Sequence, residues 1–351
     1  MGLKQRWAGW SGTRKTLIIV LLLVLFLCSA CGLITLVGIS RYQLTPPTVE
    51  PGIPPPPSTP VPPSTPVPPA TPVPPSTPVP PSTPAPPPTP ALPPDVDVSD
   101  LIEVHIIDVG QGDAILVRAP DATVLVDGGE RNSGVVPYLQ RLGVQKLDVV
   151  VATHPHADHI GGLIDVLQQI PVDRVITNGQ LHTTLTYERF LDAIADARAE
   201  YIEVVRGDVI HAGNLVLDVL HPESLTDSLN DGSVVLRMTH GSVSFLLTGD
   251  IEKAAEEELT ATDIDLRAQI LKVAHHASRS SSTPAFLQRV QPEVAIYSAG
   301  ADNRYGHPHD ETLAALAAVG AQILGTDVHG TVVVTTDGET YQITVERPSS
   351  P

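Results

Sequence analysis

Thr153-His-Pro-His-Ala-Asp-His-Ile-Gly161 is the stretch that decides the fold, because it places four metal-binding side chains within six positions: His154, His156, Asp158 and His159. Neutral imidazole and carboxylate groups are ligands of borderline and hard divalent metal ions. A strand-like run, Leu147–Ala152, precedes the stretch, and a helix-like run follows from Gly161. Loops at the carboxyl ends of strands are where α/β proteins usually build their sites. We therefore interpret the stretch as a metal site, for two ions, rather than as a histidine-rich surface loop.

The N-terminal region contains an apolar segment with the length of a membrane anchor. Residues 17–39 are 23 residues without a charge, and a helix of that length crosses the core of a bilayer. Four basic residues lie in segment 1–16, so the positive-inside rule predicts a cytoplasmic N-terminus and an extracytoplasmic remainder. A cleaved signal peptide is the main alternative, and a lipoprotein cleavage before Cys31 is another. We favour an uncleaved single-pass anchor in the plasma membrane, because a signal peptide has a shorter apolar region.

A proline-rich segment follows the predicted anchor. Residues 45–94 hold 26 of the 36 prolines, in near-repeats of Ser-Thr-Pro-Val-Pro-Pro. Proline lacks the amide hydrogen that a sheet needs, so we expect an extended polyproline-type linker. It is either a spacer that carries a domain away from the membrane or a low-complexity linker of no selected length. Both interpretations place the function elsewhere.

Residues 95–351 have the size of one globular domain and a strongly acidic composition. Sixteen basic residues stand against 38 acidic ones, a net charge of −22. The generic basic surface with which proteins bind nucleic acid is therefore absent. A phosphate-bearing substrate stays compatible with the sequence, because bound divalent ions offset negative charge locally.

Strand-like and helix-like runs alternate along this domain. Three β runs open it, at 101–107, 114–118 and 123–126, and a second β-rich block at 215–248 includes a hairpin. Helix-like runs, such as 161–169 and 251–259, flank these blocks. Two β-rich halves with helices outside predict a four-layer αββα sandwich rather than a single doubly wound sheet.

Five motifs, in order along the chain, are similar to those of a known family: Ile107-Asp-Val-Gly-Gln-Gly-Asp-Ala114, Val126-Asp-Gly-Gly129, Thr153-His-Pro-His-Ala-Asp-His-Ile-Gly-Gly162, Leu247-Thr-Gly-Asp250 and Lys272-Val-Ala-His-His-Ala-Ser278. The chain resembles the metallo-β-lactamase-fold hydrolases and, more narrowly, the soluble hydrolase domains of DNA-uptake competence proteins of the ComEC type. Segments 303–309 and 325–331 fit the same subfamily. The resemblance runs from about residue 102 to residue 346.

The resemblance implies two divalent metal ions, zinc or manganese, with an assignment for each ligand. His154 and His156 would hold one ion, and Asp158 and His159 would hold the other. Asp250 would bridge both ions; its alternative role is to cap the helix that follows.

The resemblance leaves the remaining ligands less defined. His275 or His276 would complete the second site, and we favour His275 because it lies nearer the end of a strand. No third histidine is evident for the first ion, so we expect that site to be open or weaker. The positions considered are His182, His211 and His221, which lie in no convincing motif, and the Asn-x-x-Ser element of the subfamily, matched by Asn230 and Ser233.

Several further positions are predicted to support the site. Asp127 would hold the metal-binding loop from behind, with a simple Asp-Gly turn as the alternative. Gln111 and Asp113 would orient ligands. Ala277 stands where the family usually has glycine, which costs little unless the backbone needs a positive φ. Three residues would bind a phosphate oxygen or protonate the leaving group, unless they only form a structured polar loop: Asn303, His307 and His309.

Together these features predict a membrane-tethered, extracytoplasmic, metal-dependent phosphodiesterase or nuclease, with Asp158 in its catalytic centre. Its nucleophile would be a hydroxide activated by two metal ions. The substrate would be single-stranded DNA, another nucleic acid, or a small phosphodiester, which suits the acidic surface better. No protein partner is predicted. The alternatives are hydrolysis of a lactam, lactone or thioester at the same site, and a non-catalytic surface binding module.

Overall fold

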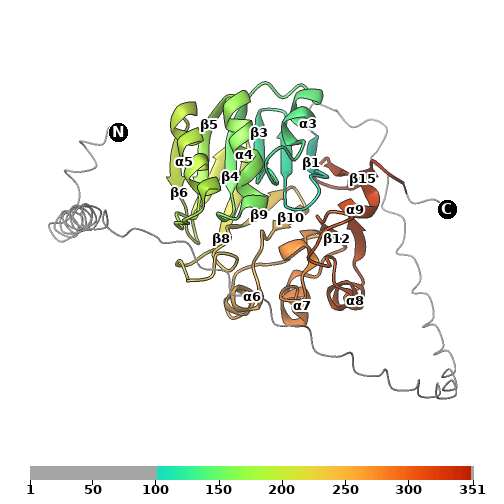
Figure 1. Ribbon diagram of the computed structural model, residues 1–351. Coiled ribbons are helices and arrows are strands. Elements are labelled where there is room, and N and C mark those ends of the chain that lie inside the picture. Colours follow the sequence, from blue (N-terminus) through green and yellow to red (C-terminus); the bar gives the residue numbers. More distant parts are fainter. Residues whose placement is uncertain (1–100, 349–351) are drawn as a thin grey trace, which may run out of the picture. The chain divides into compact units, whose positions relative to one another are not determined.

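The computed structural model describes residues 101–348, which form two β-sheets packed face to face with helices on both outer faces (Figure 1). The predicted segments 1–16, 17–39 and 45–94 lie outside the described residues. Within residues 101–348, every helix is too short or too polar to span a bilayer.

The first sheet has eight strands in the order β15-β14-β1-β2-β3-β4-β5-β6. Strands β3 to β6 run parallel, and the other neighbours pair antiparallel. Parallel strands bring their carboxyl ends to one edge of the sheet. The bounds are β1 Ile102–Ile106, β2 Ile115–Ala119, β3 Ala122–Val126, β4 Leu147–Ala152, β5 Val172–Thr177, β6 Glu200–Glu203, β14 Val332–Thr336 and β15 Tyr341–Val345.

The second sheet has seven strands in the order β13-β12-β11-β10-β9-β8-β7, and β10 to β13 run parallel. The strands β7 to β10 pair antiparallel. The bounds are β7 Val209–Ala212, β8 Leu215–His221, β9 Val235–His240, β10 Val243–Leu247, β11 Ile270–Lys272, β12 Val294–Tyr297 and β13 Gln322–Gly325.

Helices cover the outer face of each sheet, so that the described part has four layers (Figure 1). Three apolar cores separate the layers: one between the sheets, one beneath α3 to α5, and one beneath α6 to α8. The predicted αββα sandwich is confirmed. The bounds are α3 Val135–Arg141, α4 Ala157–Gln169, α5 Leu185–Ala197, α6 Lys253–Thr260, α7 Pro284–Val290, α8 Asp310–Ala318 and α9 Thr326–His329, with a short 3₁₀ turn, η2, at Ala274–Ala277.

The helix after the histidine motif begins earlier than predicted. Helix α4 begins at Ala157 rather than at Gly161, so Asp158 and His159 belong to its first turn and not to a loop. A Cβ on Gly162 would lie 1.8 Å from the carbonyl oxygen of Gly128. Gly161 and Gly162 therefore allow the helix to pack against the loop after β3, and they do not start the helix.

Candidate metal centre

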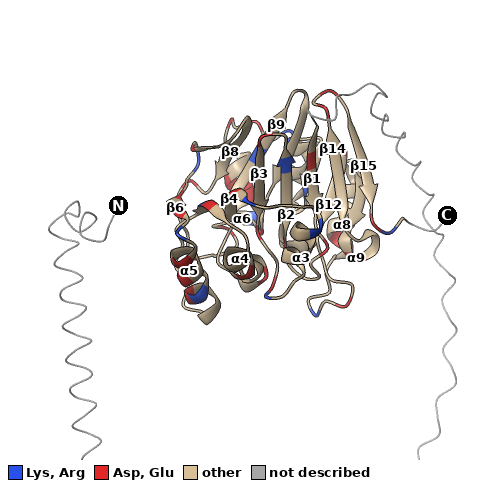
Figure 2. Ribbon diagram, turned by 90° about the horizontal axis from the view of Figure 1, so that it is seen from above, with Lys and Arg blue, Asp and Glu red and all other residues tan. Residues whose placement is uncertain are grey.

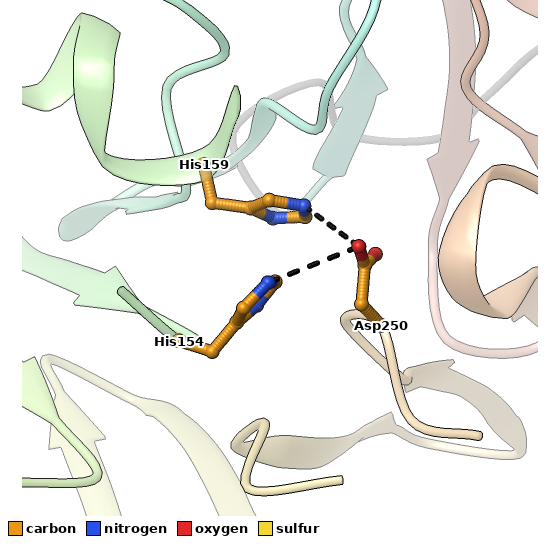
Figure 3. Close-up of side chains that lie close together, drawn as sticks. All are labelled: His154, His159 and Asp250. Carbon is orange, nitrogen blue, oxygen red and sulfur yellow. Dashed lines mark ion pairs between the residues drawn. The ribbon is translucent and has the colours of Figure 1, made fainter. Parts of the chain in front are cut away.

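The predicted metal-binding side chains converge because they follow strands whose carboxyl ends meet. Asp127 follows β3, His154 follows β4, Asp250 follows β10 and His276 follows β11. The first turn of α4 adds His159. Figure 3 shows the imidazoles of His154 and His159 pointing toward the carboxylate of Asp250 from the other sheet. Residues up to 149 positions apart in the sequence thus form one cluster.

Asp250 lies between two groups of possible ligands. Its Oδ2 is 3.1 Å from His159 Nε2, 3.8 Å from His154 Nε2 and 3.4 Å from His276 Nε2. His156 Nδ1 lies 3.0 Å from His154 Nε2, on one side of Asp250. The N-cap of α6 is Glu252 rather than Asp250, so the alternative role of Asp250 as a helix cap does not apply.

His276, and not the favoured His275, faces this cluster. His276 is 1% exposed, and its Nε2 lies 3.4 Å from Asp158 Oδ2. The side chain of His275 is 21% exposed, and its Nδ1 faces Glu252 Oε1 at 3.0 Å. Groups of acidic and imidazole atoms that lie within 4.8 Å of one another include His276 with Asp158 and His159, and His154 with His159 and Asp250. The geometry therefore favours His276 over His275 as the ligand of the second site.

Each of the three buried histidines uses Nδ1 to hold its ring in place. The partners of Nδ1 are Asp127 Oδ2 for His159 at 2.8 Å, the Ser298 carbonyl for His276 at 3.1 Å, and the hydroxyls of Thr153 and Ser233 for His154 at 3.1 and 3.3 Å. Carboxylate and carbonyl oxygens only accept, so Nδ1 carries the hydrogen in His159 and His276. Nε2 is then the atom with which each ring faces the cluster, as in metal-binding histidines.

Asp127 fixes the metal-binding loop as well as His159. Its Oδ1 accepts the Thr153 amide hydrogen at 2.8 Å, and its Oδ2 accepts the Thr153 hydroxyl at 2.7 Å. The side chain is buried and has φ of 58°. Asp127 therefore makes specific hydrogen bonds to the histidine motif, which a simple Asp-Gly turn would not require.

The Asn-x-x-Ser element lies beside the cluster. Ser233 Oγ accepts the Asp250 amide hydrogen at 3.1 Å and lies next to His154 Nδ1. Asn230 lines the pocket in front of Asp250, and its buried Oδ1 has no hydrogen-bond partner. His221, one of the positions considered for an additional ligand, instead donates from Nδ1 to the Ser233 carbonyl at 3.1 Å.

A buried ion pair that the sequence did not reveal supports His276. Lys272 Nζ donates to Asp113 Oδ2 at 2.7 Å and to the Val273 carbonyl at 3.0 Å. Asp113 Oδ1 lies 3.4 Å from His276 Nδ1. Both members of the pair are 1% exposed. Lysine is rarely buried unless it is paired, and no pattern in the sequence indicates this partner.

The chemistry of these donors fits divalent cations. Buried polar atoms nearly always have a partner, yet Nε2 of His159, Nε2 of His276 and Oδ1 of Asp250 have no hydrogen bond in the described structure. Burial raises the pKa of Asp250, but His159 and His276 outweigh it and hold that pKa well below its usual value. Burial and the neighbouring His159 hold the pKa of His154 well below its usual value. The cluster therefore stabilises the charged form of Asp250 and the neutral form of His154, which are the forms that bind a metal ion.

A pocket opens in front of these donors toward a polar loop. His307 and Tyr305 line it together with Gln111 and His275. Asn303 does not face the pocket; its side chain donates to the carbonyls of Gly300 and His307 and thereby braces the loop. His309 Nδ1 accepts the Arg279 amide hydrogen at 3.3 Å, and its ring lies 5.0 Å from that of His307.

The backbone at the second histidine pair is strained. His275, His276 and Ala277 have φ of 48°, 55° and 61°, and the left-handed region costs an L-residue roughly 1–2 kcal/mol. Ala277 therefore occupies a position where a positive φ is needed, so its replacement of glycine is not free of cost. Strain of this kind gathers at functional sites.

The family model of the metallo-beta-lactamase superfamily matches residues 107–301. The chain belongs to this superfamily. Its curated relatives include ComE operon protein 3 of Bacillus subtilis, 36% identical over 251 residues, which are 66% of this chain and 32% of that protein. Competence protein ComA of Neisseria gonorrhoeae is 31% identical over 235 residues, 65% of this chain and 31% of that protein.

The expected likeness to competence-type hydrolase domains is thus confirmed, and the chain spans about a third of the length of these relatives. Among solved structures, the metallo-β-lactamase-fold protein YhfI of Bacillus subtilis aligns with 67% of this chain and 100% of its own, at 15% identity and a TM-score of 0.48.

Proposed function

We propose that residues 95–351 form a phosphodiesterase that uses two divalent metal ions and acts on nucleic acid or a smaller phosphodiester. One observation carries the proposal: the buried imidazoles of His154, His159 and His276 all lie within 3.8 Å of the carboxylate of Asp250, which lines an open pocket. The competence and recombination names of several relatives favour a phosphodiester over a lactam or thioester.

His154, His156 and Asp250 would hold one ion, and Asp158, His159 and His276 would hold the other together with Asp250. Zinc and manganese both suit this mixture of imidazole and carboxylate. When bound, the ions would supply Lewis-acid activation of water and charge stabilisation at the phosphate. Hydrogen bonds between Asp127 and His159 and between Ser233 and His154 hold these two ligands in position.

His307 would bind a phosphate oxygen as a neutral donor. Burial, followed by the charges of His276 and His275, lowers the pKa of His307 to about 4, so the ring is neutral at pH 7 and is a poor proton donor to a leaving group. Its Nδ1 is buried without a hydrogen-bond partner, beside the pocket. His309 can donate from Nε2, since its Nδ1 accepts the Arg279 amide hydrogen.

The placement outside the cytoplasm is part of the proposal. An anchor at 17–39 and a linker at 45–94 would present the domain extracytoplasmically, a topology supported by the apolar and proline-rich composition. Protease added to intact cells should release the acidic domain. Release only after the cells are lysed would contradict this topology.

The test of activity uses the purified full chain in mild detergent, treated with chelator and then supplied with zinc or manganese. We expect turnover of bis-p-nitrophenyl phosphate and little turnover of nitrocefin. Asp158→Ala should remove about two to three orders of magnitude of the rate. Asp192→Ala, at an exposed position on α5, is the matched control. Unchanged activity of Asp158→Ala, or hydrolysis of nitrocefin alone, would contradict the proposal.

A further inference from the structure

One aromatic side chain lies exposed at the rim of the metal pocket. Tyr305 lines the pocket and is 48% exposed. The other large apolar side chains exposed in residues 101–348 are leucines and valines. A single exposed apolar side chain is ordinary, but an aromatic ring at the mouth of a pocket offers a flat face on which a ligand can stack.

The loop holds this ring in a defined orientation. Asn303 Oδ1 accepts the amide hydrogens of Tyr305 at 3.1 Å and His307 at 3.0 Å. The rings of Tyr305 and His307 are nearly parallel, at 20° and 5.8 Å between centroids. Because His307 lies over the pocket next to His276, a flat group stacked on this loop would adjoin the phosphate position.

A cation lies beside the ring, in a domain with a net charge of −22. The Arg304 guanidinium lies 5.1 Å from the Tyr305 ring centroid, and its Nη2 donates to the Tyr305 hydroxyl at 3.0 Å. Acidic residues outnumber basic ones on other elements, such as α5, which has three acidic residues and one arginine (Figure 2). A planar cation beside an aromatic ring is a combination that binds bases by stacking.

We propose that Tyr305 and Arg304 form a binding site for a nucleobase next to the phosphodiester that is cleaved. The inference rests on the proposed function and names its substrate as a base-bearing, single-stranded phosphodiester. A base inside a duplex is not available for such stacking. The acidic surface away from the rim limits the binding site to the nucleotides around the cleaved bond.

The test measures cleavage by the metal-loaded full chain of three substrates: a thymidine dodecamer, a dodecamer of the same length with abasic residues, and the dinucleotide thymidylyl-thymidine. Wild type should prefer the thymidine dodecamer over the abasic one in kcat/KM by roughly 5- to 100-fold, the effect of one base-aromatic stack. Tyr305→Ala should reduce this preference to near unity through KM, Tyr305→Phe should keep it, and Arg304→Ala should reduce it in part. Val328→Ala, at an exposed apolar position on α9, is the control.

The outcomes separate the two proposals. Cleavage of both dodecamers with equal kcat/KM, or an unchanged preference in Tyr305→Ala, would overturn the base site and leave the phosphodiesterase intact. Failure to cleave any of the three substrates by a chain that hydrolyses bis-p-nitrophenyl phosphate would overturn the base site, and failure on bis-p-nitrophenyl phosphate as well would overturn the phosphodiesterase itself. If Tyr305→Ala lowers kcat/KM equally for the dinucleotide and the thymidine dodecamer, the result would support a site for the adjoining base. If it lowers kcat/KM for neither substrate, the result would count against this site.

Discussion

Replacing Lys272 by methionine should destabilise the protein strongly, because Lys272 is the counter-charge of a buried carboxylate. Lys272 Nζ and Asp113 Oδ2 are 2.7 Å apart, and both side chains are 1% exposed. Burial raises the pKa of Asp113, but Lys272 and His276 outweigh it and hold that pKa at about 2. Methionine keeps the apolar stem of lysine and removes the charge, so the change leaves Asp113 charged without its partner.

The magnitude follows from the burial of both partners. Removing one member of a fully buried ion pair costs roughly 3–5 kcal/mol, whereas replacing both members is close to neutral. We therefore expect Lys272→Met to lose about 3–5 kcal/mol of the free energy of unfolding at pH 7. The double variant Lys272→Met/Asp113→Asn should lose clearly less, because no uncompensated charge stays buried.

The assay is urea unfolding in the presence of chelator, so that bound metal does not contribute to the stability. Lys253→Met is the control, because Lys253 is exposed and pairs with Glu257 at 3.6 Å on the surface of α6, where an ion pair contributes little. A loss for Lys272→Met no greater than that for Lys253→Met would refute the reasoning. A double variant less stable than Lys272→Met would refute it as well.

Three further predictions concern the metal ligands and a buried acid. His276→Ala should weaken binding of metal at least tenfold in a calorimetric titration, whereas His275→Ala should bind as wild type does; the reverse order would reject our assignment. Asp127→Asn should weaken metal affinity 10- to 100-fold while leaving the fold intact by circular dichroism, and unchanged affinity would show that Asp127 only forms a turn. Burial raises the pKa of Glu256 from 4.5 to about 7, against the backbone donors of Thr283 and Ser282. The folded state then binds the proton more tightly than the unfolded state. As pH rises from 4.5 to 7, the free energy of unfolding of wild type should therefore fall by up to about 3 kcal/mol relative to that of Glu256→Gln. A difference in stability between the two proteins that does not change with pH would contradict this.

The histidine motif and the layered fold could be read from the sequence because both depend on local patterns. His154, His156, Asp158 and His159 are close in the sequence, and the alternation of strand-like and helix-like runs reports which faces are buried. Motifs similar to those of a known family then supplied Asp250, which lies on the other sheet.

The errors arose where the conformation depends on distant contacts. His275 and His276 are equivalent in a sequence pattern, and only the run of positive φ angles turns His276 inward. Lys272 pairs with a residue 159 positions away, so its partner is not evident from the sequence. Strands β6, β7 and β13 were not predicted, because each lies at an edge of a sheet and none is a fully buried apolar run like β11 and β12.

The most direct test of the account follows hydrolysis of bis-p-nitrophenyl phosphate by the chelator-treated chain as zinc or manganese is added stepwise. If Asp250 joins two metal sites, the initial rate should rise and reach its plateau at two ions per chain. A plateau at one ion, a rate independent of added metal, or no hydrolysis with both sites saturated would contradict the two-metal phosphodiesterase.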